Sequence, residues 1–201
     1  MEQELNRYKA KAALLGIEIR TDGSALVSVS GQTGESIEIP GCIKVINPGA
    51  FSQLAPLKEV RFAKGVEVIE RDAFSGCRYL ESVCLPDTLC RIGEAAFFKC
   101  EHLKEIEIPG GVECLNNYAF RMCHSLTRVK ISEGMKEIGS GAFEDCRSLF
   151  RVELPVSCRS IGAHAFRGCT QMREVVLPYS LSEIREDAFD GCNPELVIRR
   201  R

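Results

Sequence analysis

The sequence predicts an α/β repeat solenoid of seven coils, and three observations lead to this fold class. The dipeptide Ala-Phe recurs every 23 residues, from Ala50-Phe51 to Ala188-Phe189. Several other apolar columns, among them a column of cysteines, keep the same period without an insertion. One unit of this length cannot bury its own apolar face, whereas stacked copies enclose one continuous core. We therefore expect each phenylalanine of the repeat to stack on the phenylalanine of the next coil.

Residues 1–35 precede the repeats, and their pattern predicts a cap made of a helix and a β-hairpin. Apolar residues spaced three and four apart indicate an amphipathic helix. These residues are Leu5, Tyr8, Ala12 and Leu15. Residues 17–20 and 25–30 are extended patterns, and Asp22-Gly23 between them suits a hairpin turn. A solenoid needs such a cap because its first coil would otherwise expose core side chains and an open sheet edge.

Residues 36–201 form the predicted solenoid, whose unit reads L-x-x-V-x-L-P-x-x-V-x-x-I-x-x-x-A-F-x-x-C-x-x. The V-x-L part alternates as a strand does, with both apolar side chains on one face. The proline that often follows ends this strand, because it has no N–H for the ladder. V-x-x-I is expected to form a second short extended segment or a tight turn. A-F-x-x-C-x-x-L has apolar residues three and four apart, which favours a short helical turn.

The end of the chain predicts one further strand with a charged terminus. Asn-Pro at residues 193–194 breaks the repeat, and residues 196–198 (Leu-Val-Ile) can still extend the sheet. Three arginines follow at residues 199–201. Charges on an edge strand discourage pairing with further chains, so we interpret this segment as a charged cap.

The repeat resembles the leucine-rich repeats of the bacterial BspA-like class, also called the treponemal type, whose unit has the form L-x-x-V-x-I-P-x-x-V-x-x-I-G-x-x-A-F-x-x-C. The chain matches this unit in seven copies from about Ser36 to Arg199, although the glycine after isoleucine is kept only as Gly93, Gly139 and Gly162. The resemblance implies a curved leucine-rich-repeat solenoid with a parallel sheet on its concave face. It also implies protein binding, and some members of the class are surface proteins that adhere to host matrix. No catalytic residues accompany the motif.

The composition argues against several classes of function. The chain has 26 Lys and Arg against 28 Asp and Glu, so it lacks the positive charge expected of nucleic-acid binding or of a polybasic membrane-surface protein. No run of 18 apolar residues predicts membrane insertion. The motifs G-x-S-x-G, P-loop and H-E-x-x-H are missing from the sequence, so we expect neither enzyme activity nor a cofactor.

The cysteine column allows three interpretations, of which a row of small buried hydrophobic residues in a reducing compartment is favoured. Disulfides between adjacent coils are the second, and the odd total of 11 Cys already excludes complete pairing. The third is a metal site, for which residues of two adjacent coils could supply a Cys₂His₂ set. That set would be Cys100, His102, Cys123 and His124. Because the spacing of structural zinc sites is absent, we expect no metal.

Candidate binding residues lie in the two columns that flank the inward valines of the strands, since successive strand residues point to opposite faces. Their basic cluster is Arg128, Lys130 and Arg151, and acidic residues rim it. The alternative for most of these residues is a solvated face on which charges alternate to prevent self-repulsion. The predicted binding residues on the concave face are Arg61, Glu105, Glu107, Arg128, Lys130, Arg151 and Glu153. Neither column contains an aromatic ring of the kind that sugar-binding faces usually offer, and Phe150 lies just outside them.

These observations predict a non-enzymatic protein-binding scaffold that acts as a monomer on a protein partner. The alternative is a cell-surface or secreted adhesin of the same family that binds host matrix or protein. Residues 1–16 lack the apolar stretch of a signal peptide, so a chain that begins at Met1 is expected in the cytoplasm. A chain trimmed from a longer one would allow secretion or display on the cell surface.

Overall fold

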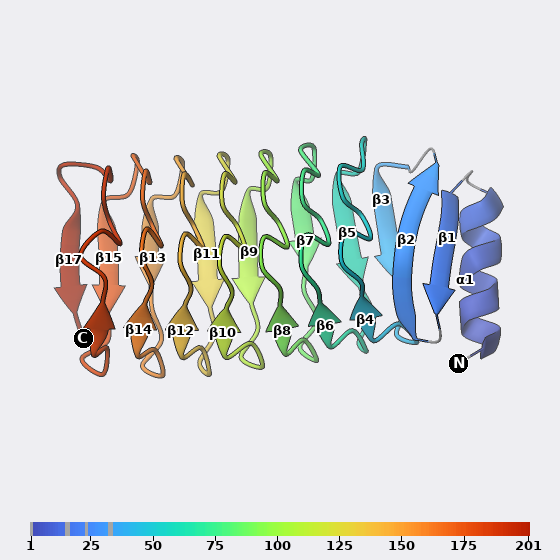
Figure 1. Ribbon diagram of the computed structural model, residues 1–201, viewed down its shortest axis with the longest axis horizontal. Coiled ribbons are helices and arrows are strands. Elements are labelled where there is room, and N and C mark those ends of the chain that lie inside the picture. The colour runs from blue at the N-terminus through green and yellow to red at the C-terminus, as the bar shows by residue number, and fades with distance from the viewer. Residues whose placement is uncertain (1, 15–16, 23, 32–33) are drawn as a thin grey trace.

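The computed structural model describes residues 2–14, 17–22, 24–31 and 34–201. Its coils stack side by side in one row, with the N-terminal helix at one end and the last strand at the other (Figure 1). Within the described residues the strands form two sheets, one of nine strands in the order β1-β2-β4-β6-β8-β10-β12-β14-β16 and one of eight in the order β17-β15-β13-β11-β9-β7-β5-β3. Each coil of the repeat therefore contributes one strand to each sheet, as a leucine-rich-repeat solenoid does.

The eight-stranded sheet is built from the V-x-L segments. Its strands are Ser36–Ile39 (β3), Glu59–Phe62 (β5), Ser82–Cys84 (β7), Glu105–Ile108 (β9), Arg128–Ile131 (β11), Arg151–Glu153 (β13), Glu174–Leu177 (β15) and Val197–Arg200 (β17). All pairs in this sheet are parallel and in register from coil to coil, so that Val129 of β11 pairs with Ile106 of β9. The last strand, expected from residues 196–198, pairs in parallel with β15.

The nine-stranded sheet contains the V-x-x-I segments, which the sequence left open between an extended segment and a turn. They are two-residue strands: Val45–Ile46 (β4), Val68–Ile69 (β6), Arg91–Ile92 (β8), Cys114–Leu115 (β10), Glu137–Ile138 (β12), Ser160–Ile161 (β14) and Glu183–Ile184 (β16). In β4 to β14 the second residue of each strand, an isoleucine or Leu115, is buried and its neighbour is more exposed, as in β8 and β12. In β16, Ile184 is 36% exposed. The extended alternative is therefore the one that the structure adopts.

The core is a continuous column of phenylalanine rings, as the repeat predicted. Phe51, Phe74, Phe97, Phe120, Phe143 and Phe166 are fully buried. The rings of successive coils stack with centroid distances between 4.7 Å and 5.6 Å, and the column ends on Phe189. Burial of one such side chain contributes roughly 1.5–3 kcal/mol.

The prediction of a short helical turn at A-F-x-x-C was wrong. This segment is a series of tight turns whose backbone bonds span three residues, as from the Cys77 amide to the Phe74 carbonyl. Alternate amides bond across to the next coil, and the Phe74 N–H donates to the Ala96 carbonyl at 2.7 Å. Since these amides are bonded between coils, they cannot close the bonds of four-residue span that a helix needs. The hydrogen bonds between coils are favoured over a local helical turn because they recur along the whole stack.

The cap consists of the helix Glu2–Leu14 (α1) and the antiparallel strands Ile17–Asp22 (β1) and Ala25–Gly31 (β2). Helix α1 lies beside β1 (Figure 1). Its Leu5 side chain packs against the core. Strand β2 pairs in parallel with β4, so the hairpin heads the nine-stranded sheet. Leu15, Gly23 and the side chain of Ala12 lie outside the described residues. Among the helices described, none has the length and apolar character needed to cross a membrane.

Candidate functional site

The outer face of the eight-stranded sheet carries all seven predicted binding residues. Along β9 and β11 the side chains alternate between exposed and buried, so Glu105, Glu107, Arg128 and Lys130 point outward while the apolar residues point into the core. Arg151 is exposed on β13, and Glu153 beside it is half-buried. Parallel pairing places residues of one column about 4.8 Å apart in neighbouring coils.

The basic cluster exists, but its ion pairs reduce its net charge. Lys130 Nζ lies 2.5 Å from Glu107 Oε1 on the neighbouring strand. Arg151 reaches two carboxylates, with Nη2 at 3.0 Å from Glu153 and Nε at 2.8 Å from Glu174. Two of the three predicted cations are therefore neutralised by carboxylates of the same face. This is the charge alternation that the sequence offered as the alternative to a binding site.

Arg128 differs from its two neighbours. It pairs in register with Glu105 on one side and with Arg151 on the other. Within the part of the chain that the structure describes, its guanidinium forms no ion pair, and the side chain is exposed. Arg128 is thus a cation beside a second cation, which makes it the position of this face best suited to receive a carboxylate from outside.

Arg61 does not belong to this cluster. It lies on β5, and the strands β7 and β9 separate it from β11. Its Nε lies 2.8 Å from Glu59 Oε1 on its own strand, and this hydrogen bond raises the pKa of the guanidinium. The seven predicted residues therefore divide into one group on β9, β11 and β13 and one separate residue.

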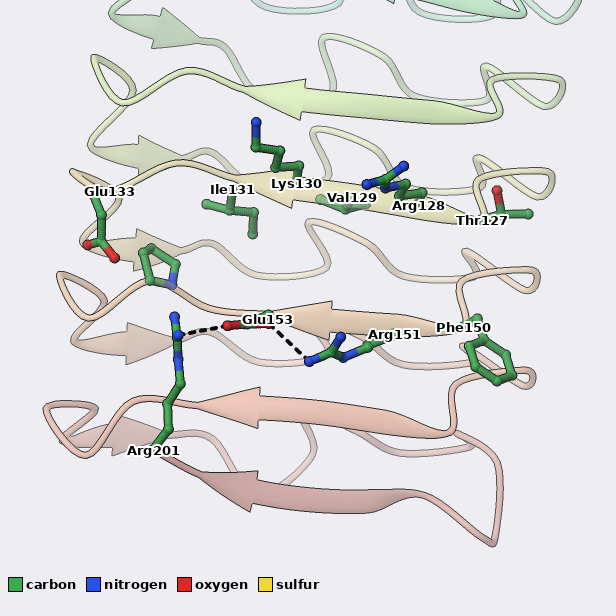
Figure 2. Close-up of a pocket in the computed structure, with 11 residues that line it drawn as sticks. Thr127, Arg128, Val129, Lys130, Ile131, Glu133, Phe150, Arg151, Glu153 and Arg201 are labelled. Atoms are coloured by element: carbon green, nitrogen blue, oxygen red, sulfur yellow. Dashed lines mark hydrogen bonds and ion pairs between the residues drawn. The ribbon is translucent and has the colours of Figure 1, made fainter.

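Sequence reasoning missed Arg201, which it assigned to a charged terminal cap. Its Nη1 lies 2.8 Å from Glu153 Oε1, so the end of the chain reaches back across β15 to β13 (Figure 2). Arg201, Arg128, Lys130 and Arg151 line one shallow depression with a cavity volume of about 470 Å³. No periodic signal could reveal this contact, because residue 201 lies beyond the last copy of the repeat.

Phe150 lies at the rim of the same depression (Figure 2). Its side chain is 53% exposed, and the equivalent positions in the two preceding coils are Lys104 and Thr127. An exposed ring beside a row of cations gives this end of the face both an apolar and a charged component. Such a combination of aromatic and arginine side chains is typical of the centre of protein interfaces.

The cysteine column consists of free thiols, five of them buried and Cys192 half-buried, and each thiol donates a hydrogen bond, which the sequence did not reveal. Each Sγ bonds the carbonyl oxygen of the phenylalanine in the preceding coil, at 3.3 Å from Cys100 to Phe74 and 3.3 Å from Cys123 to Phe97. The six members are Cys77, Cys100, Cys123, Cys146, Cys169 and Cys192. Burial raises the pKa of the Cys77 thiol to about 12. A serine or alanine would lose either the apolar fit or the donor, which explains a cysteine at this position.

Three of the four residues of the alternative metal set form other contacts, and His124 Nε2 is buried without a hydrogen-bond partner among the described residues. The thiols of Cys100 and Cys123 point to carbonyl groups in the core. His102 lies at the surface, where its Nδ1 is 2.8 Å from the Arg78 carbonyl oxygen. Among the described residues, no three His, Cys, Asp or Glu side chains are grouped so as to hold a metal ion.

The repeat region of the chain is similar to known leucine-rich repeat proteins. The sequence matches the family model described as BspA type leucine rich repeat region over residues 30–150 and 96–198, in six copies. A leucine-rich repeat protein from Eubacterium ventriosum has a similar structure, with a TM-score of 0.81 and 24% identity over 88% of this chain. This chain spans 48% of the length of that protein. Among curated proteins, the comparison found no match.

Two further solved structures share the fold. The leucine-rich repeat protein of T. pallidum aligns with a TM-score of 0.52 and 22% identity, over 92% of this chain and 83% of its own. The pneumococcal vaccine antigen PcpA aligns with a TM-score of 0.50 and 24% identity, over 82% of this chain and 51% of its own. These similarities establish the solenoid fold. They do not identify a partner, which has to be inferred from the surface residues of this chain.

Proposed function

The chain belongs to the BspA-type leucine-rich repeat family, and from this premise we propose that it is a scaffold that binds a protein partner through the outer face of β9, β11 and β13. Repeat proteins of this kind are typically non-enzymatic and offer extended surfaces for protein interaction. The partner surface that complements this face contains a carboxylate for Arg128 and an apolar group for Phe150.

The observation that carries the proposal is the contrast between Arg128 and the rest of the face. Its neighbours satisfy their charges within the sheet, through Lys130 to Glu107 and Arg151 to Glu174. Within the described residues Arg128 has no such partner, although Glu105 stands next to it in register. A charge-assisted hydrogen bond from a partner's carboxylate would satisfy the guanidinium.

The test compares three versions of the protein as bait. One is the wild type, and one carries Arg128→Glu, Lys130→Glu and Arg151→Glu. The matched control reverses Lys44, Arg91 and Lys136, three cations of other surfaces that also pair with carboxylates, to Glu. Both variants change the charge equally, and thermal denaturation confirms that each is folded.

We expect a partner captured by the wild type and the control to lose at least about tenfold in affinity for the sheet variant, which corresponds to about 1.4 kcal/mol. Baits are exposed to lysate of the source cell and to extracellular-matrix extract. A specific partner from matrix alone would favour the second candidate, an adhesin. Equal affinity of all three versions would place the binding site away from this sheet.

A further inference from the structure

A second surface lies along the turn segments that join each two-residue strand to the next long strand, such as residues 70–81 and 93–104. We call this surface the turn edge. Each outward position occurs once in every coil, so a residue on this edge can be compared with its equivalents in the other coils. In the column of Tyr79 and His102, the next coils carry Ser125, Ser148 and Gln171. Aromatic side chains therefore replace small polar ones in neighbouring coils of one edge.

The same coils carry two more rings in adjacent columns. Phe98 stands between Ser75 and Arg121 in its column, and Tyr118 stands between Ala95 and Gly141. Four rings thus gather on the turn edge of three consecutive coils, where the sheet face has none in its two exposed columns.

The rings are accessible to solvent. Tyr79 is 51% exposed and Tyr118 is 37% exposed. Phe98 is half-buried and does not belong to the partly buried residues that pack against the core. The rings of Tyr79 and His102 stack with centroids 5.7 Å apart, and the bond of His102 to the Arg78 carbonyl holds this stack in place. The core therefore does not account for these side chains.

Tyr118 has the left-handed backbone that its column also adopts at Asp72, Ala95 and His164. Its φ is +59°, in the left-handed region that disfavours bulky side chains. Glycine occupies the same position as Gly49 and Gly141. A Cβ built on Gly141 would lie 2.6 Å from the Tyr118 ring, so the glycine leaves room for the ring above the next coil.

A concave site opens beside these rings. Its cavity volume is about 380 Å³, within the range of about 300–1,000 Å³ that is common for small-ligand sites. Its walls include Tyr79, Phe98, Arg78, Lys99, Gln53 and Ser75. Two of these are cations, and no carboxylate occurs among the described residues of the lining. Glu101 lies outside it, with Oε1 at 3.7 Å from Arg78 Nε.

We propose that this site binds a carboxylated sugar residue of an acidic glycan. The electron-rich face of an aromatic ring attracts the polarised C–H groups of a pyranose. Tyr79 and Phe98 both border the cavity, with His102 stacked on Tyr79 and Lys99 Nζ 5.1 Å from the centroid of Phe98. Arg78 and Lys99 pair with the carboxylate of the sugar. Gln53 and Ser75 supply an amide and a hydroxyl for its hydroxyl groups. The ring of His102 extends the Tyr79 column into the next coil, with centroids 5.7 Å apart, and contacts the next residue of the glycan.

The test is calorimetric titration of the whole protein with hexagalacturonate and with a hyaluronan hexasaccharide. The hexagalacturonate after reduction of its carboxyl groups serves as the neutral probe. The variants are Tyr79→Ala and, as a matched control, Tyr179→Ala, which removes a 77% exposed tyrosine of another surface. Both side chains project from the surface, so both variants are expected to fold.

We expect at least one acidic hexamer to bind, with the affinity of Tyr79→Ala lowered by about tenfold and that of Tyr179→Ala unchanged. The reduced hexamer and the variant Lys99→Gln should each bind about tenfold more weakly. Binding of neither acidic hexamer, or equal binding of the reduced one, would overturn the proposal. So would Tyr79-dependent binding of an acidic peptide or of single-stranded oligothymidylate in place of the sugars, since cations and rings also suit those ligands.

Discussion

At the scale of single residues, the cysteine column shows how one side chain meets two demands. Each thiol fills a small apolar space and donates to a phenylalanine carbonyl of the preceding coil, as Cys123 does to Phe97. That carbonyl also accepts the amide of Cys100 within its own coil. The thiol is therefore a second donor to a carbonyl group that already accepts one hydrogen bond. This limits the contribution of the thiol's hydrogen bond to stability.

Replacement of Cys123 by alanine is expected to lower the free energy of unfolding by about 1–2 kcal/mol, because a net hydrogen bond and a small volume are both lost. Urea denaturation measures this change. The matched control is Cys84→Ala, since Cys84 is exposed on the sheet face, and it should stay within about 0.5 kcal/mol of the wild type. Equal effects of the two substitutions would mean that the bond to Phe97 contributes nothing.

The raised pKa values of the buried thiols predict a stability that depends on alkaline pH. The pKa of Cys77 rises from 9.0 in the unfolded chain to about 12 in the fold, because burial disfavours the thiolate. The contribution of the protonated Cys77 thiol to the free energy of unfolding is fully present below pH 9. It is lost as the pH rises from 9 to about 12, because in this interval the thiol ionises in the unfolded chain but stays protonated in the fold.

Each such thiol should add up to about 1.4 kcal/mol per pH unit to the loss of stability above its unfolded pKa. Urea denaturation of wild type and Cys77→Ala between pH 8 and pH 10.5, as approximate limits, measures the difference in slope. The slope for Cys77→Ala should be smaller. Parallel curves for the two proteins would show that Cys77 ionises equally in both states.

At the scale of elements, the phenylalanine column and the ladder between coils are one structure. The Phe120 amide donates to the Ala142 carbonyl at 2.8 Å, while its ring stacks on Phe97 and Phe143. The bond fixes the coil spacing, and the spacing lets the rings stack. This coupling explains why Ala-Phe keeps a constant period in all seven copies.

Phe120→Ala in the central coil should cost about 3–5 kcal/mol, because the fully buried ring leaves a cavity between two others. Phe150→Ala, which removes a 53% exposed ring, is the control and should cost less than about 0.5 kcal/mol. Chemical denaturation of both variants tests the stacked core. An unchanged midpoint for Phe120→Ala would contradict it.

At the scale of the whole molecule, each coil contacts its neighbours alone, so the two ends differ from the middle. The N-terminal end is covered by the hairpin and α1. At the other end Phe189 is half-buried, and Ile198 is 50% exposed because no further coil of the described chain covers it. Stability in such a stack is a sum of coil and interface contributions, which makes the outer coils the weaker ones.

Hydrogen exchange should therefore show a gradient along the stack. Amides of β9 and β11, which have strands on both sides, should exchange only on global unfolding, whereas those of β17 should exchange through local opening. Mass spectrometry of peptides from each coil measures the rates. Uniform protection from β3 to β17 would indicate one cooperative unit without fraying at its C-terminal end.

The sequence was sufficient to predict the coils and to predict which strand side chains point outward. The period of Ala-Phe fixed the stack, and the alternation around Val129 fixed which side chains of β11 point outward. It was insufficient for the A-F-x-x-C segment, where apolar spacing suits both a helix and a series of turns. There the choice depends on carbonyl groups of the next coil, such as Ala96 for Phe74, which a local pattern does not contain.

The sequence by itself determined the fold, the buried columns and the outward position of Arg128, Lys130 and Arg151, because these follow from a period repeated along the chain. Tertiary structure decided which charges remain available, since the return of Arg201 to Glu153 and the pairing of Arg151 with Glu174 depend on the stacking of coils. It also decided that rings from different columns of the repeat, Tyr79 and Phe98, border one cavity. Periodicity reports what the copies share, whereas a binding surface arises where neighbouring copies differ.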